Sequence, residues 1–77
     1  MDTKAIGERI RIAREERCMS QQRLANAVGC TASYISAIER GERAPNLETF
    51  VAIASALRVP INFFFPVLPP IGEHILQ

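Results

Sequence analysis

The sequence is poor in the residues that build metal sites and catalytic centres. Its 77 residues include two cysteines and one histidine. Cys18 and Cys30 stand apart, and no second cluster of cysteine or histidine lies at a zinc-binding spacing. No Ser/His/Asp or Cys/His arrangement, carboxylate pair or phosphate-cradling glycine loop is visible. We therefore expect no enzyme, no metal and no other cofactor. Both thiols are expected to be reduced, and a redox switch is the less favoured alternative.

The sequence also lacks a targeting signal and a membrane-spanning run. Met1 and Asp2 lead directly into an amphipathic segment, without the pattern of a signal peptide. The apolar C-terminal stretch is too short to cross a bilayer, and prolines interrupt it at positions 60, 66, 69 and 70. We expect one cytoplasmic globular domain with a modest core and no membrane partner.

A large excess of charge of one sign is absent as well. The net charge is +1, which does not by itself indicate a polyanionic partner. The charged residues are distributed slightly unevenly. Residues 17–43 contain more arginines than glutamates, whereas the only Asp, Glu, Lys or Arg among residues 60–77 is Glu73. The pattern is consistent with nucleic-acid binding but does not diagnose it.

What the sequence does contain is a capped helix with an unusual outward face. Thr31 is a suitable N-cap, and Gly41 is the residue type that ends a helix in the left-handed conformation. Helical periodicity places Ile35, Ile38 and Glu39 on one face. The opposite face is small and almost uncharged, and it consists of Ala32, Ser33, Ser36, Ala37 and Arg40. Such a face can approach another surface closely, and our hypothesis is that this surface is DNA.

The segment before this helix completes a helix-turn-helix pattern. Ser20 is expected to cap a helix that starts at Gln21 and buries Leu24 and Val28. A short turn through Gly29 then leads to the helix that Thr31 caps. Two short helices joined by a tight turn that contains glycine are typical of this motif.

Two opposite charges lie on apolar stripes and need partners. A first helix is predicted from about Lys4 to Arg17, and Arg14 shares its stripe with Ile10 and Ala13. Glu39 lies on the apolar face of the helix that Thr31 caps. Because an isolated buried charge costs several kcal/mol, we predict that Arg14 and Glu39 pair with each other.

The remaining residues predict two further helices. Asn46 caps a helix from about Leu47 to Arg58, and Pro60 starts a short fifth helix that ends near Phe65. Of the three consecutive phenylalanines 63–65, we expect one or two to pack inward and another to remain at the surface. The positions of the fourth helix expected to face the core are Leu47, Phe50, Val51, Ala54 and Leu57.

Four runs of the sequence together resemble the Cro and phage-repressor (XRE-type) helix-turn-helix family. In order they are Ile6–Ile10, Ser20–Ala25, Tyr34–Gly41 and Pro45–Thr49. The resemblance implies an all-α, compact five-helix, lambda-repressor-like domain over residues 1–65, with the second and third helices as the helix-turn-helix. It implies a dimer that binds operator DNA, and it also supports the pairing of Arg14 with Glu39.

Carried over position by position, the resemblance assigns DNA contacts to nine residues of this chain. The residue expected to bind a phosphate from the start of the second helix is Gln21. Those expected at or near base edges are Thr31, Ala32, Ser33, Ser36 and Ala37. Those expected to reach the sugar-phosphate backbone are Tyr34, Arg40 and Arg43. For Tyr34, packing over the preceding helix is an open alternative.

The sequence departs from the family pattern in two ways. Cys18 stands where the family commonly has glycine, so the first helix is expected to close differently. The base-facing set also lacks the Gln, Asn and Arg side chains that make bidentate contacts with bases. We therefore expect weak direct readout, with DNA shape supplying much of the specificity.

The functional expectation is a sequence-specific regulator of transcription that binds double-stranded DNA, more specifically a repressor or autoregulator. It would act as a homodimer on an inverted repeat, and the apolar tail, residues 66–77, would form or extend the dimer interface. The tail could instead fold back over its own domain. Specialised versions are a controller of a restriction–modification operon and an antitoxin whose apolar C-terminal tail binds a toxin as protein partner. The alternative from another class is a protein-interaction module on the same fold, such as an antitoxin-like partner-binding protein.

Overall fold

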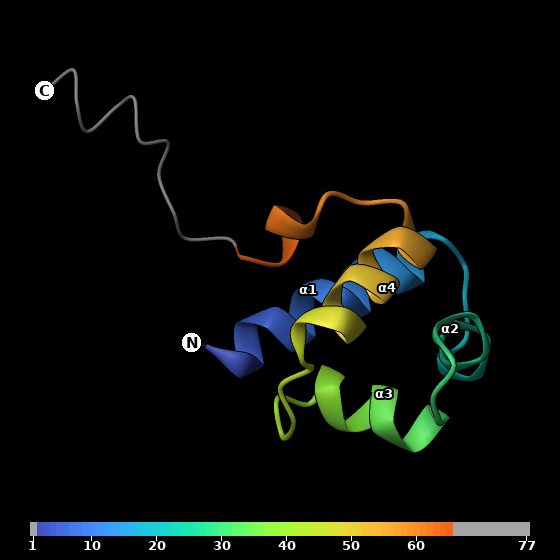
Figure 1. The fold of residues 1–77 in the computed structure, drawn as a ribbon, viewed down its shortest axis with the longest axis horizontal. Helices are drawn as coiled ribbons and strands as arrows, with labels where there is room; N and C mark the ends of the chain where they lie inside the picture. Colours follow the sequence, from blue (N-terminus) through green and yellow to red (C-terminus); the bar gives the residue numbers. More distant parts are fainter. Residues whose placement is uncertain (1, 66–77) are drawn as a thin grey trace, which may run out of the picture.

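The computed structural model describes residues 2–65, which form four α-helices and one short 3-10 helix (Figure 1). The helices are α1 (Thr3–Glu16), α2 (Gln21–Val28), α3 (Ala32–Glu39) and α4 (Leu47–Leu57), and the 3-10 helix is η1 (Ile61–Phe64). No strand occurs within residues 2–65. The tail, to which we assigned a dimerisation role, lies outside the described residues.

The expected fifth α-helix is wrong, although the all-α class is confirmed. The segment after Pro60 closes with bonds of the tighter 3-10 type. The N–H of Phe63 donates to the carbonyl of Pro60, and that of Phe65 donates to Asn62, at 2.9 and 3.1 Å. The four residues of η1 make a single turn of this kind, which is common in short connecting segments.

Each α-helix begins at a side-chain cap. The cap oxygen accepts the backbone N–H of the residue three positions later, which satisfies one of the otherwise unpaired donors of the first turn. Ser20, Thr31 and Asn46 act as predicted, and Asp2 caps α1 in the same way. These local bonds fix where the helices start.

The core is built mainly from branched aliphatic side chains of all four helices and from Phe64. Its fully buried large members are Ile10, Leu24, Ile35, Ile38, Ile53, Leu57 and Phe64. Of the three consecutive phenylalanines, Phe64 is fully buried, while Phe63 and Phe65 are half-buried against the core. The expectation of one inward ring is met, but none of the three is left exposed at the surface. Phe65 packs against Phe50 of α4, with ring centroids 5.4 Å apart.

The predicted inward face of α4 is partly wrong. Leu47 and Val51 are 73% and 53% exposed, whereas Ile53, which we did not assign, is fully buried. The buried stripe runs through Phe50, Ile53, Ala54 and Leu57, at helical spacing. Leu47 and Val51 lie beside this stripe rather than on it. The inward face was misassigned because α4 is apolar around most of its circumference, so hydrophobic periodicity does not define one face.

α1 and α3 cross at very short range, and a glycine makes this possible. A β-carbon added at Gly7 would lie 2.2 Å from the carbonyl oxygen of Ile38 and 2.7 Å from that of Glu39. Just after α3, Gly41 takes a positive φ of 80° with its backbone close against Lys4 of α1. Thr3 also donates its hydroxyl to the Gly41 carbonyl at 3.0 Å. The end of α3 is thus held against the first turns of α1.

We expect Gly7→Ala to lower the free energy of unfolding by about 2–4 kcal/mol, because the two helices must separate to admit the methyl group. Chemical denaturation followed by circular dichroism measures the loss. Gly29→Ala is the matched control, since a β-carbon there meets nothing within 4 Å and costs only the strain of a positive φ, about 1–2 kcal/mol. Equal losses for the two variants would contradict the close crossing.

Cys18 closes α1 in the left-handed conformation that glycine usually adopts at helix ends. Its φ is +55°, and the N–H groups of Cys18 and Met19 donate to the carbonyls of Glu15 and Arg14. This is the Schellman arrangement, which normally carries a glycine at the left-handed position. The helix end therefore closes in the usual geometry, with a strained residue, and the expected difference in closure does not occur.

Cys18→Gly is expected to raise the free energy of unfolding by about 0.5–1 kcal/mol, because the strain of a β-carbon at positive φ disappears. Thermal and denaturant unfolding measure the gain. Cys18→Ala removes the thiol but keeps the β-carbon, so it should give no gain. Stabilisation by alanine as large as that by glycine would show that the thiol, and not the backbone, is the source.

Candidate nucleic-acid interface

α2, a short turn and α3 form the helix-turn-helix that the sequence predicted. Gly29 ends α2 with a φ of +85°, and the N–H groups of Gly29 and Cys30 both donate to the Ala25 carbonyl. Ala25 is fully buried, and its small side chain leaves room for α3 to pack closely. Cys30 is half-buried against the core, and its partial burial raises the pKa of its thiol. These features indicate a packing role for Cys30.

A buried ion pair ties α1 to the end of α3. Nε and Nη2 of Arg14 donate to the two carboxylate oxygens of Glu39 at 2.7 and 3.0 Å. The two side chains are only 11% and 3% exposed. Hydrogen bonding by Glu39 raises the pKa of Arg14 above its ordinary value. The pairing expected from the sequence is therefore present, in the bidentate form that guanidinium and carboxylate favour.

Two further bonds extend this pair to the start of α2. The remaining amino group of Arg14, Nη1, donates to the carbonyl of Met19 at 2.7 Å, and Nε2 of Gln21 donates to Glu39 at 3.0 Å. The bond from Gln21 to Glu39 was not predicted from the sequence. Its amide nitrogen carries a second N–H, so one donor remains for another partner. The network fixes α1, the turn after it, α2 and α3 relative to one another.

The outward side of α3 is left uncovered by the rest of the fold. Thr31 and Ser33 are exposed, while Ala32, Ser36 and Ala37 are half-buried. The Thr31 oxygen accepts the N–H of Tyr34 as the helix cap, so its own hydroxyl hydrogen can still be donated. α3 runs along one edge of the fold (Figure 1), and residues we expected at base edges are therefore open to a ligand.

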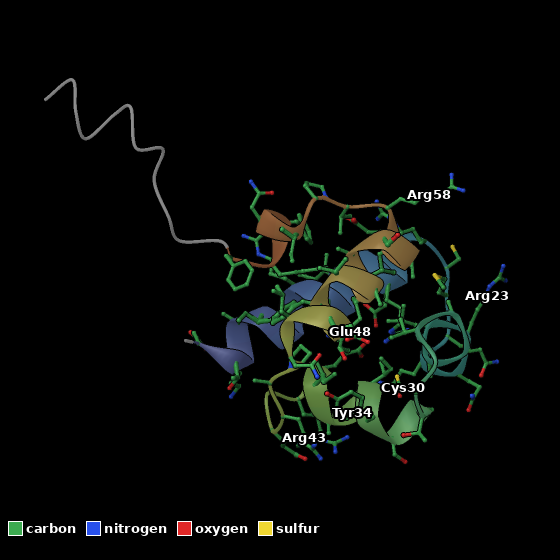
Figure 2. All side chains as sticks on the ribbon, in the orientation of Figure 1. Arg23, Cys30, Tyr34, Arg43, Glu48 and Arg58 are labelled. Carbon is green, nitrogen blue, oxygen red and sulfur yellow. The ribbon has the colours of Figure 1, made fainter. Side chains whose placement is uncertain are left out.

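Tyr34 of α3 and Arg43 of the loop that follows lie close together (Figure 2). The tyrosine is half-buried against the core, and the guanidinium carbon of Arg43 lies 5.2 Å from the centre of its ring. This cation–π contact orients Arg43 without neutralising its charge. Tyr34 thus both packs against the core and holds a basic side chain.

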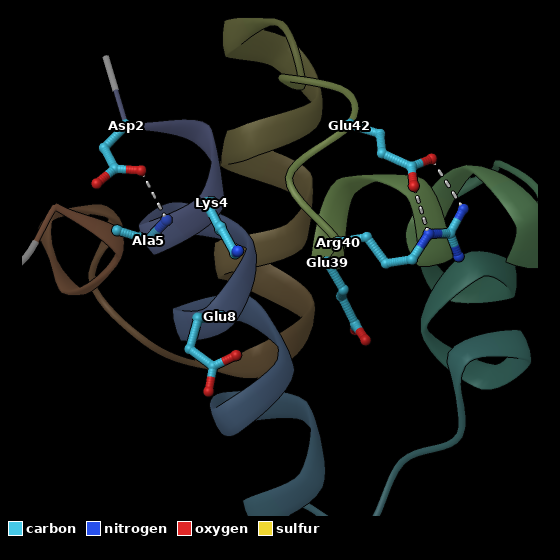
Figure 3. A pocket seen from close by; sticks show the side chains of 7 residues that line it. All are labelled: Asp2, Lys4, Ala5, Glu8, Glu39, Arg40 and Glu42. Atoms are coloured by element: carbon cyan, nitrogen blue, oxygen red, sulfur yellow. Dashed lines mark hydrogen bonds and ion pairs between the residues drawn. The ribbon is translucent and has the colours of Figure 1, made fainter.

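Arg40 has a carboxylate partner that sequence reasoning did not find. Nε and Nη2 donate to the two oxygens of Glu42 at 2.8 and 3.0 Å, and Nη1 donates to the hydroxyl of Ser36. Figure 3 shows the pair at the rim of a hollow between α1 and the end of α3. The hydrogen bonds from Arg40 hold the pKa of Glu42 below its usual value. The two glutamate oxygens and the arginine fork are all exposed to solvent.

Other kinds of site receive no support from the described residues. Within residues 2–65 no group of three His, Cys, Asp or Glu side chains is placed to hold a metal ion. None of the helices in that range is long and apolar enough to cross a membrane.

Arg14→Met tests the ion pair, because it leaves Glu39 buried with only Gln21 as a donor. We expect the free energy of unfolding to fall by roughly 3–5 kcal/mol. The double variant Arg14→Met/Glu39→Met removes both charges and should lose much less, since no unpaired charge remains buried. A loss below about 1 kcal/mol for Arg14→Met alone would contradict a buried, mutually dependent pair.

The fold and this interface define a compact helix-turn-helix protein whose α3 is free on one side. A profile of the helix-turn-helix family HTH_3 matches residues 10–64, and the chain belongs to this family. The Cro and phage-repressor resemblance seen in the sequence is thereby confirmed.

Relatives and structural neighbours agree with this assignment. The chain is 40% identical over 75 residues to an uncharacterized HTH-type transcriptional regulator, y4dL, of Sinorhizobium fredii. The match covers 97% of this chain but only 38% of that protein, so the chain spans well under half of its relative. The restriction-modification controller protein C.AhdI of Aeromonas hydrophila superimposes with a TM-score of 0.80 at 33% identity, over 83% of this chain and 97% of that one.

A second solved structure is similar to this chain and contains DNA. It is the P22 c2 repressor in complex with a synthetic operator, with a TM-score of 0.74 and 36% identity. The match covers 77% of this chain and 89% of the repressor chain. The proteins that this chain resembles are thus regulators rather than enzymes.

Proposed function

We propose that this protein binds double-stranded DNA by placing α3 in the major groove, and that it regulates transcription in this way. The main support for this proposal is that α3 has one face anchored to the rest of the fold and an opposite face that the fold leaves uncovered. Glu39 anchors the inner side of α3 to Arg14, while the outer side carries small residues that let the backbone approach the bases closely. A rigid element with a small, uncovered face is what entry into a groove requires.

Phosphate contacts would come from groups around α3. Gln21 retains one amide N–H at the start of α2, and Arg43 is positioned over Tyr34 beside α3. Arg40 supplies a further guanidinium from the end of α3. Contacts of this kind set the orientation of a protein on the duplex but carry little sequence information.

Base recognition would use short side chains. Thr31, Ser33 and Ser36 can donate to or accept from several bases, and Ala32 and Ala37 can contact a thymine methyl group. None of these makes the bidentate contacts that discriminate one base strongly. We therefore propose that DNA shape and deformability contribute much of the specificity.

The regulatory role we propose is that of a cytoplasmic repressor or autoregulator that binds an inverted repeat as a homodimer. The likeness to a phage repressor with operator DNA supports the repressor role, and the likeness to C.AhdI supports a controller role in a restriction–modification operon. Leu47 and Val51 supply exposed apolar surface for a dimer contact, to which residues 66–77 would add.

A second candidate is a protein-interaction module on the same fold, such as an antitoxin-like protein. The exposed apolar side chains of Leu47 and Val51 and the net charge of only +1 favour it. In this case the α4 surface, and not α3, would carry the function.

Selection from a random-sequence duplex library distinguishes the two functions. We expect enrichment of an inverted repeat with half-sites about one helical turn apart, and an affinity that falls steeply as salt rises from about 50 to 200 mM. A variant with Ser33→Glu and Ala37→Glu keeps the fold but places two carboxylates on the outer face of α3, and it should bind no duplex. Absence of any enriched motif, together with absence of salt-dependent binding, would support the protein-interaction module.

A further inference from the structure

Arg40 and Glu42 face each other across the turn that ends α3. The turn is rigid, because Gly41 adopts its left-handed conformation and the N–H of Glu42 donates to the Ala37 carbonyl at 2.9 Å. The backbone of Gly41 is also held by Thr3 and packed against Lys4. The main chain of Glu42 therefore has a fixed position, from which its carboxylate meets the fork of Arg40 (Figure 3).

This arrangement occupies the part of Arg40 that would bind a phosphate. A guanidinium has five N–H groups and two edges that bind carboxylates and phosphates in bidentate fashion, one formed by Nε with a terminal nitrogen and one by the two terminal nitrogens. The first of these is the edge that meets Glu42 in Arg40, and the other terminal nitrogen donates to Ser36. Arg43 differs, because within the described residues it has no carboxylate at ion-pair distance and rests on Tyr34.

We propose that Glu42 acts as an internal competitor of DNA phosphate for Arg40, which lowers the affinity of the protein for any duplex. The inference rests on the proposed DNA-binding function and assigns a regulatory residue within that interface. A carboxylate and a phosphate oxygen present the same acceptor geometry to the fork, so binding of one excludes the other. While Glu42 occupies the fork, Arg40 makes no bidentate phosphate contact, so the duplex gains little from this guanidinium. Because the pair is exposed and weak, we expect the effect on affinity to be modest.

The pair also connects the competition to base recognition. Ser36 lies one turn before Arg40 on the outer side of α3, and its oxygen is engaged by Nη1 of the same guanidinium. When Arg40 turns to a phosphate, this bond to Ser36 is released and its hydroxyl oxygen becomes available as an acceptor. With weak direct readout by α3, restraint of phosphate binding limits attachment to unrelated DNA.

A double-mutant cycle between Arg40 and Glu42 tests the proposal. Affinity for a mixed-sequence duplex is measured for wild type, Glu42→Gln, Arg40→Gln and the double variant. We expect Glu42→Gln to bind about two- to fivefold more tightly, with a salt slope steeper by about 0.9, because one more phosphate contact forms. Arg40→Gln should cost less than about twofold in wild type but several-fold when Glu42 is already glutamine.

Glu48→Gln is the matched control. Glu48 is exposed in the first turn of α4 and does not contact Arg40. Its substitution by glutamine changes the net charge of the protein by the same amount as Glu42→Gln. It should show no coupling to Arg40→Gln. Equal effects of Glu42→Gln and Glu48→Gln, or additivity of Arg40 and Glu42 substitutions, would overturn the competition and leave DNA binding intact. Failure of the wild type to bind duplex DNA in a salt-dependent way would instead overturn the proposed function and the inference with it.

Discussion

The arrangement of this protein depends on one buried ion pair, between Arg14 of α1 and Glu39 of α3. Burying two charges is expensive, and the structure offsets the cost by giving every nitrogen and oxygen of the two charged groups at least one hydrogen bond. These bonds join the two groups to each other, to the Met19 carbonyl and to Gln21. The consequence is mainly geometric. Both helices of the helix-turn-helix are connected to the side chains of Arg14 and Glu39. These bonds therefore hold α3 in a single orientation relative to α1 and α2.

This constraint divides α3 into a held side and an open side. Gly7 and Gly41 allow the end of α3 to lie directly against α1, and the ion pair then fixes its rotation. What remains uncovered is a surface of short side chains bordered by Arg40 and Arg43. The proposed contributions of base contacts and phosphate contacts to DNA binding follow from that surface. Bases are read weakly, phosphates are bound by few groups, and one of these groups is restrained by Glu42.

Local signals in the sequence predicted much of this structure, whereas contacts set by helix crossing were not predictable. The caps Ser20, Thr31 and Asn46 act on residues three positions away, and the pairing of Arg14 with Glu39 followed from two unlike charges on apolar stripes. The face of α4 was misassigned because the helix is apolar almost throughout. The close approach at Gly7 and the bond from Gln21 to Glu39 depend on where other elements lie, which no single-sequence pattern contains. The bonds between Arg40 and Glu42 are local, but they depend on the conformation of the turn at Gly41.

The central claim is that the open side of α3 is the DNA-binding surface, and amide chemical shifts during a duplex titration of the 15N-labelled protein test it most directly. We predict that the shifts concentrate at residues 31–37, at Gln21 and at residues 40–43. Shifts confined to the surroundings of Leu47 and Val51, with those of α3 unchanged at saturation, would contradict it.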